Sequence, residues 1–206
     1  ALQTNCELQD MRTWSFKNEG KPSSGINGRP TNYYQSQEKI WYMSNGFPSL
    51  ITSFCISDDL QSLFKESDLR FKFYFSNRDR RGNLWEDGRY RYLQNLDYSF
   101  GVPEMMLIEA ESLARNNDSK ALDILNAIRQ KRFTDADYQP LTAADGESLL
   151  DIVLKERRRE LCLNSLRWLD MKRLAAEGKY TKTLTRTLND KTYTLEPTSK
   201  LYVFTM

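Results

Sequence analysis

The chain has no histidine, few cysteines and no long apolar run, and each absence excludes a class of function. Without histidine, it lacks the most common general base and the commonest imidazole metal ligand. Cys6, Cys55 and Cys162 are widely spaced and form no CxxC pair, so neither a disulfide framework nor a zinc site is expected. We therefore expect no metal and no cofactor.

Membrane spans and nucleic-acid binding are also disfavoured. No stretch approaches the roughly 20 apolar residues that a span needs. Thirty Lys plus Arg against 28 Asp plus Glu leave a net charge of +2, too little to attract a polyanion. The chain begins without Met, at ALQTNCELQD, and the pattern of a signal peptide is absent there, so a fragment or a processed product is expected.

Residues 1–100 are rich in aromatic side chains and predict loops with a few short elements. Ser57 is placed to cap a short helix that contains Asp58 and Asp59. The alternating segments RFKFYF (70–75) and GRYRYLQ (88–94) predict a β-hairpin. Its inner face would carry Phe71, Phe73 and Phe75.

Residues 101–178 predict two pairs of helices, and residues 179–206 a terminal hairpin. Pro103 suits a first helical position, an Asn-Asn-Asp stop follows, and SKALDILNAIRQKRF then resumes helical spacing, which indicates an αα-hairpin. ESLLDIVLKERRRELCLN and SLRWLDMKRLAAEG form the second pair, ending at Gly178. An Asn189-Asp190 turn between Thr-rich segments predicts the hairpin.

The stretch ERRRELCLNSLRWLDMKR (156–173) concentrates charge. Arg157 shares a stripe with Leu150 and Leu161 and therefore faces the core, where a guanidinium needs a carboxylate. Glu111 lies on an apolar stripe too, so we expect it to pair with Arg157 or Arg158. Within the helices, Glu160 is spaced to reach back to Arg157, and Asp170 lies three residues from both Arg167 and Arg173. The predicted network, structural rather than catalytic, comprises Glu111, Arg157, Arg158, Glu160, Arg167 and Asp170, with Arg173 as a further partner of Asp170.

Several ordered motifs resemble the C-terminal part of SusD/RagB-type proteins. PEMMLIEAESLA, ALDILNAIRQKR and LLDIVLKERRRELCLNSLRWLDMKRL follow that family's pattern, and YVFTM resembles the start of its closing motif. The resemblance covers about residues 50–206. One departure is that Asn164-Ser165 stands where the family usually has Glu-Gly.

The resemblance implies a mainly α, TPR-like helical-repeat scaffold with long loops and short hairpins, as one C-terminal domain or fragment over residues 1–206. It implies a non-enzymatic lipoprotein on the bacterial outer-membrane surface that captures glycan for a SusC-like TonB-dependent transporter. The family's N-terminal half, with its lipid anchor, would then be a further partner outside this chain. Cys6 lacks the apolar lead-in of a lipidation site.

Sugar rings stack on aromatic planes while their hydroxyl groups need fixed polar partners. Loop aromatics with polar neighbours are therefore the candidate ligand contacts. The alternative is that these aromatics only pack the loops onto the helices. The candidates are Tyr34, Trp41, Tyr42, Asn83 and Trp85, whereas Trp168 is expected to pack between helices.

Two other functions remain open from the sequence. A helical-repeat adaptor would bind protein without touching sugar. A glycosidase would need two carboxylates about 5 to 10 Å apart across a cleft, and a sequence does not exclude such a pair.

Overall fold

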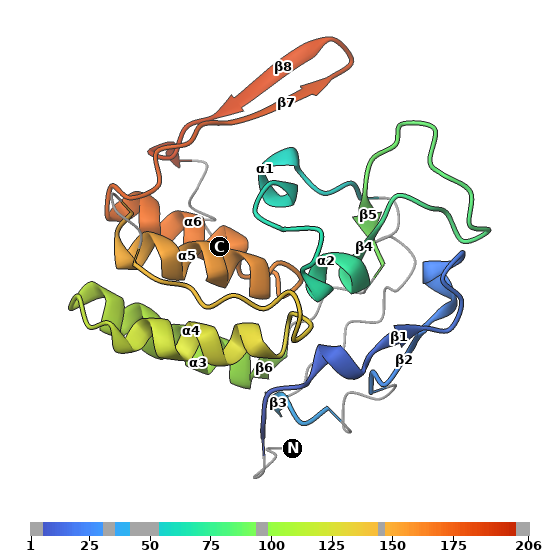
Figure 1. Ribbon diagram of the computed structural model, residues 1–206. Helices are drawn as coiled ribbons and strands as arrows, with labels where there is room; N and C mark the ends of the chain where they lie inside the picture. The colour runs from blue at the N-terminus through green and yellow to red at the C-terminus, as the bar shows by residue number, and fades with distance from the viewer. Residues whose placement is uncertain (1–5, 31–35, 42–53, 94–98, 144–146, 201–206) are drawn as a thin grey trace. The chain divides into compact units, whose positions relative to one another are not determined.

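The computed structural model describes residues 6–30, 36–41, 54–93, 99–143 and 147–200 (Figure 1). The chain forms two compact units, residues 1–164 and 165–206. The expected fold class, mainly α with long loops and short hairpins, is confirmed. Helices supply most of the regular structure, and each described strand pairs with one antiparallel neighbour.

The first unit begins with short elements joined by loops. They are η1 (Met11–Thr13), β1 (Ser15–Phe16), η2 (Pro22–Ser24), β2 (Ile26–Asn27), β3 (Lys39–Trp41), α1 (Asp58–Gln61), α2 (Leu69–Tyr74), β4 (Phe75–Ser76), β5 (Arg91–Tyr92) and β6 (Phe100–Gly101). Strand pairing joins β1 to β2, β3 to β6 and β4 to β5. The Ser57 cap of α1 is confirmed, because its side chain accepts a hydrogen bond from the backbone N–H of Leu60.

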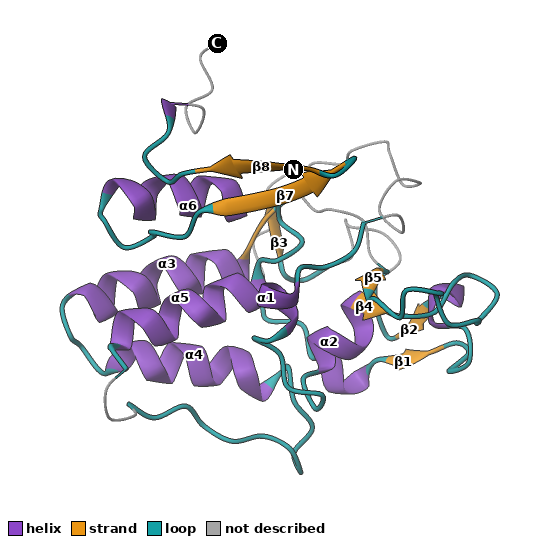
Figure 2. Ribbon diagram, turned by 90° about the horizontal axis from the view of Figure 1, so that it is seen from above, coloured by secondary structure: helices purple, strands orange, loops and turns teal. Residues whose placement is uncertain are grey.

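Three longer helices form the main layer of this unit: α3 (Val102–Arg115), α4 (Lys120–Gln130) and α5 (Leu149–Glu160). Helix α3 packs against both α4 and α5, and Figure 2 shows the three lying side by side. The predicted αα-hairpin is confirmed, and Asn117 turns the chain with a φ of 54°. Apolar residues at helical spacing are fully buried between these helices, namely Leu107, Ala110, Ala121, Leu125, Ile128 and Val153.

The expected strand over residues 70–75 is wrong, because residues 69–74 form helix α2 and only Phe75 and Ser76 belong to a strand. Asp68 caps this helix by accepting from the backbone N–H of Arg70, and the buried Arg70 side chain reaches across to α5. The helical turn also sends the phenylalanines to different places, so the alternation of apolar residues did not indicate a strand with one buried face.

Two aromatic clusters flank α2. Phe73 packs with Met11, Trp14 and Ile26, and so ties α2 to the N-terminal segments. Phe75 packs with Ile56 and Leu60, and Phe71 joins this second cluster. The predicted hairpin survives only as the two-residue pairing of β4 with β5, in which Phe75 lies opposite Tyr92.

The second unit contains α6 (Arg167–Ala176), β7 (Leu184–Leu188) and β8 (Lys191–Leu195). Helix α6 ends as expected before Gly178, which has a φ of 70°. The predicted terminal hairpin is confirmed, with Leu188 opposite Lys191. Asn189 and Asp190 both have positive φ, as a two-residue type I′ turn requires.

The described residues contain neither a membrane-spanning helix nor a cluster of metal ligands. None of their helices has both the length and the apolar character to cross a bilayer. No group of three or more Cys, Asp or Glu side chains among them is arranged to hold a metal ion.

Candidate functional site

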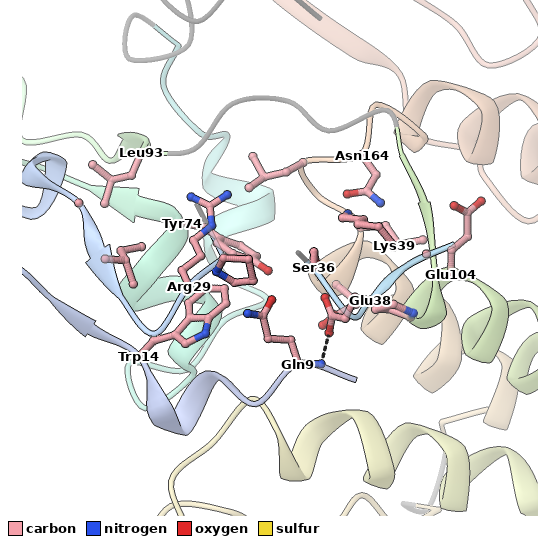
Figure 3. A pocket seen from close by; sticks show the side chains of 18 of the residues that line it. Gln9, Trp14, Arg29, Ser36, Glu38, Lys39, Tyr74, Leu93, Glu104 and Asn164 are labelled. Atoms are coloured by element: carbon pink, nitrogen blue, oxygen red, sulfur yellow. Dashed lines mark hydrogen bonds between the residues drawn. The ribbon is translucent and has the colours of Figure 1, made fainter. Parts of the chain in front are cut away.

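The first unit contains a cavity of about 460 Å³ between the N-terminal segments, α2, the start of α3 and the end of α5 (Figure 3). Residues from distant parts of the chain line it. Its neutral polar and aromatic lining residues include Gln9, Trp14, Ser36, Tyr74 and Asn164. Charged side chains also line it, namely those of Lys17, Arg29, Glu38, Lys39, Glu104 and Glu160. This volume lies within the range of small-molecule sites, roughly 300 to 1,000 Å³.

Two aromatic side chains form part of the wall. Trp14 is 8% exposed, and an edge contact with Phe73, at 5.5 Å between ring centroids, fixes its plane. Its indole Nε1–H is buried and has no hydrogen-bond partner among the described residues. Burial, reinforced by the negative charge of Glu160, raises the pKa of Tyr74 well above its ordinary value, so its hydroxyl stays protonated. The wall therefore offers apolar ring surface together with a neutral phenol.

Two side-chain amides line the same cavity, and Figure 3 shows them on different sides of it. The backbone of Gln9 is held on both sides, since its N–H donates to Glu38 at 2.8 Å and its carbonyl accepts from Arg132. The side-chain amides of Gln9 and Asn164 make no hydrogen bond to another described residue. Each can accept and donate at once, which suits a hydroxyl group.

Arg132 organises the floor of the cavity. Its fully buried guanidinium donates to Glu160 at 2.7 Å and to Glu38 at 2.6 Å, besides the carbonyl of Gln9. The backbone carbonyl of Glu38 accepts from the N–H of Val102 at 2.8 Å, which ties the same segment to the start of α3. One side chain of α4's C-terminal extension therefore holds three cavity residues in fixed positions.

A second buried cation, Arg70, continues this network away from the cavity. It is bidentate to Asp68 and also donates to Glu156 at 2.7 Å and Glu160 at 2.8 Å. Glu156 further accepts from Arg159 at 2.7 Å and Arg129 at 3.3 Å. All partners of Arg70 are nearly inaccessible to solvent, so the network is a buried ionic core.

Both buried glutamates remain ionised. Burial alone would raise the pKa of Glu156, but the nearby guanidinium of Arg70, with Arg159 and Arg129, lowers it far below its ordinary value. Burial likewise opposes ionisation of Glu160, and Arg132 and Arg70 outweigh it and lower its pKa. Neither carboxyl group is available as a proton donor near neutral pH.

The sequence model of the SusD family matches residues 90–206, more than half of the chain. The chain belongs to the SusD family. The structure also resembles the crystal structure of a SusD-like carbohydrate-binding protein from Bacteroides vulgatus ATCC 8482. The TM-score is 0.56 at 17% sequence identity, which is a likeness of fold.

The similarity to that crystal structure extends over 98% of this chain but only 50% of the other, so the chain spans about half the length of its relative. A search of curated proteins gives no match. The family's sequence motifs therefore lie in the helical part of the chain, α3 to α6, whereas most cavity residues come from segments before residue 90.

The expected ion-pair network of this SusD-family chain lies partly where it was predicted. Glu111 and Arg157 are buried as expected, at 7% exposure each, and Glu111 accepts from Arg115 at 2.7 Å. Arg158 pairs with Asp59 of α1. The direct pairing of Glu111 with Arg157 stays a prediction.

Glu160 makes more long-range contacts than its position in the sequence predicts. It was expected to reach back to Arg157 within α5, but its carboxylate accepts from Arg70 and Arg132. These partners could not be predicted from local spacing, because they lie 90 and 28 residues away along the chain.

Within the second unit, Asp170 accepts from Arg173 at 2.8 Å, as the spacing predicts. The guanidinium of Arg167 lies over the ring of Tyr180, at 5.2 Å from its centroid. A pairing of Arg167 with Asp170 stays a prediction. Trp168 is half-buried within α6.

Of the predicted ligand aromatics, the two that the structure describes, Trp41 and Trp85, do not line the cavity. Trp41 is 43% exposed at the end of β3, opposite Phe100, and does not line the cavity. Tyr34 and Tyr42 lie outside the described residues. A role for these three in binding stays a prediction.

Trp85 and Asn83 lie on a different loop, between β4 and β5. Asn83 is exposed and bonds to Asp79 of the same loop. Trp85 lines a smaller pocket of about 230 Å³, and the guanidinium of Arg91 lies 4.2 Å from its ring centroid. Neither residue contacts the larger cavity.

Sequence reasoning missed Trp14, Gln9 and Tyr74, which only tertiary contacts bring together. One signal was available for Asn164. It replaces the acidic residue usual at that position in the SusD family, next to Ser165, which has a φ of 57° where the family usually has glycine.

Proposed function

We propose that this chain binds glycan without catalysis, as part of a bacterial surface protein that delivers oligosaccharide to a TonB-dependent outer-membrane transporter. Membership of the SusD family and the likeness in fold to a carbohydrate-binding protein support the general class. The observation that carries the proposal is the cavity itself. It combines an indole face with two amides, Gln9 and Asn164, that no described residue engages.

This combination fits a sugar better than it fits a peptide or a charged metabolite. Sugar rings present apolar C–H faces to an aromatic wall, and their hydroxyl groups each need both a donor and an acceptor. Trp14 and Tyr74 supply the aromatic surface, and Gln9, Ser36 and Asn164 supply neutral polar groups. Opposite charges, from Lys17 and Glu38 for example, surround the cavity and give it no strong preference for a charged ligand.

Two of the three carboxylates that line the cavity, those of Glu38 and Glu160, argue against glycoside hydrolysis. A glycosidase needs one carboxyl group that is protonated and one that is free to attack or to activate water. The pKa of Glu160 is lowered, and both of its oxygens accept from arginine. Glu38 holds the backbone of Gln9 and the guanidinium of Arg132. These two carboxylates therefore hold the site together.

Substituting both amides is expected to weaken glycan binding. The double variant Gln9→Ala, Asn164→Ala removes two neutral hydrogen-bonding groups, each contributing about 0.5 to 1.5 kcal/mol, so the affinity for a bound neutral oligosaccharide should fall about 5-fold to about 150-fold. Affinity gel electrophoresis against a panel of neutral polysaccharides identifies a ligand, and titration calorimetry with its oligosaccharide measures the loss.

Two controls separate this site from the loops that the sequence favours. Asn83→Ala removes an exposed amide outside the cavity, and Trp41→Ala removes an exposed aromatic ring. Both variants should bind as the parent chain does. Binding that survives loss of both amides but fails with Trp41→Ala would move the site to the loop, and binding to no glycan would favour a protein-binding adaptor.

A further inference from the structure

The smaller pocket, of about 230 Å³, differs in chemistry from the cavity described above. It is formed by the loop between β4 and β5 together with Ser23 of η2. Four arginines line it, Arg78, Arg80, Arg81 and Arg91, against one carboxylate, that of Asp79. No comparable excess of one charge borders the larger cavity.

The loop is built around Asp79, whose carboxylate accepts hydrogen bonds from backbone N–H groups of the same loop. Asp79 accepts from the backbone N–H groups of Arg81 at 2.8 Å and Asn83 at 2.9 Å. Although its limited burial opposes ionisation, these N–H donors lower the pKa of Asp79. Its charge is thus used to close the turn.

The arginines divide into two pairs. Arg91 is bidentate to Asp87, at 3.0 and 2.8 Å, and Arg78 donates to the carbonyl of Gly82. The guanidinium groups of Arg80 and Arg81 make no hydrogen bond or ion pair with any described residue. Two neighbouring exposed cations therefore line the pocket, and no described residue engages their guanidinium groups.

A buried donor lies in the same pocket. The indole Nε1–H of Trp85 is inaccessible to solvent and has no partner among the described residues. Arg91 covers one region of this indole, with its guanidinium carbon 4.2 Å from the ring centroid. A buried N–H without an acceptor costs free energy unless a ligand supplies one.

The loop between β4 and β5 is also held in one conformation, so a ligand would not have to order it on binding. Backbone hydrogen bonds join Asp79 to Asn83 and Trp85 to Asn77. Gly82 has a φ of 94°, and a Cβ there would lie 2.5 Å from the carbonyl oxygen of Gly20, so the loop packs tightly on the η2 segment. The arginines are presented on a preformed frame.

We propose that this pocket binds an oxyanion carried by a sugar, a uronate carboxylate or a sulfate ester, and that the protein therefore takes acidic glycans. Arg80 and Arg81 supply charge-assisted hydrogen bonds to the anion, and the ring of Trp85 forms part of the pocket wall. The pocket is smaller than a typical drug-sized site, so it accommodates a single charged unit. The inference extends the proposed function, because the ligand is a glycan in both.

The test compares an acidic oligosaccharide with its neutral counterpart on the same chain. Probes are oligogalacturonate and its methyl ester, and a sulfated galactan oligosaccharide with its desulfated form. Titration calorimetry at low and high salt should show the parent chain binding at least one acidic probe about tenfold more tightly than the neutral partner, with the preference falling as salt rises.

The variant Arg80→Gln, Arg81→Gln should remove that preference and leave the affinity for the neutral partner unchanged. The control Lys65→Gln, Lys120→Gln removes two exposed cations elsewhere on the same unit and should keep the preference within about twofold. Trp85 fluorescence, assigned by loss of its signal in Trp85→Phe, should change on adding the acidic probe.

Equal affinity for charged and neutral probes would overturn the inference and leave the proposed function standing. An acidic preference that persists in Arg80→Gln, Arg81→Gln would place the anion elsewhere and also overturn it. Binding of neither acidic nor neutral glycans would overturn both proposals together.

Discussion

Replacing Arg70 with methionine is expected to lower the free energy of unfolding by about 3 to 5 kcal/mol. Arg70 is fully buried, and its guanidinium satisfies Asp68, Glu156 and Glu160. Methionine fills part of the volume, but it leaves three buried carboxyl groups without the guanidinium that they contact, in a region that water does not reach. Asp68 loses its only ion-pair partner among the described residues. Chemical denaturation followed by circular dichroism measures the change.

The matched control is Arg158→Met on the adjoining surface. Arg158 pairs with Asp59, whose side chain is 43% exposed, so water replaces the lost partner and the change should stay within about 1 kcal/mol. If Arg70→Met cost no more than Arg158→Met, the ionic core would not be holding α2 against α5, and our account of how the site is positioned would be wrong.

Replacing Phe73 with alanine should cost about 3 to 5 kcal/mol and also weaken glycan binding. Phe73 is 1% exposed and packs edge-on against Trp14 and Phe16, at 5.5 and 5.2 Å between centroids. Its loss leaves a void behind the indole that forms the cavity wall. The ring of Trp14 would no longer be fixed, so the preformed surface for a sugar would be lost as well.

Denaturation and ligand titration of the same Phe73→Ala sample measure both effects. Phe54→Ala is the control, because Phe54 is 57% exposed and its loss should change stability by less than about 0.5 kcal/mol. A variant that is destabilised but binds glycan with unchanged affinity would show that Trp14 does not form the ligand's contact surface.

The helical half could be predicted from the sequence because its signals are local. Apolar residues at helical spacing, Pro103 at the start of α3, and the Asn189-Asp190 turn each act within a few residues. The segment around Phe73 could not be predicted in the same way. Its alternating pattern indicates a strand, whereas the buried contacts of Arg70 with α5, 86 and 90 residues away, favour a helix.

The candidate site was largely hidden for the same reason. Gln9 and Trp14 enter the cavity through contacts with Arg132 and Phe73, more than 50 residues away in sequence, and neither stands out from its neighbours along the chain. Trp85 could be recognised in the sequence as a loop aromatic with polar neighbours. The contact of its ring with the Arg91 guanidinium could not be predicted, because it depends on how the loop folds. Arg157 and Glu111 are buried, as their helical phase predicts, and their structural role stays a prediction.

The indole N–H signals of the four tryptophans test the central claim most directly, because they report which part of the chain a glycan contacts. In two-dimensional ¹H–¹⁵N spectra, with Trp14→Phe used for assignment, titration of a bound neutral oligosaccharide should shift the Trp14 signal in a saturable way. The signals of Trp41 and Trp168 should stay in place. A saturable shift confined to Trp41 or Trp168, with Trp14 unchanged, would contradict binding in the cavity.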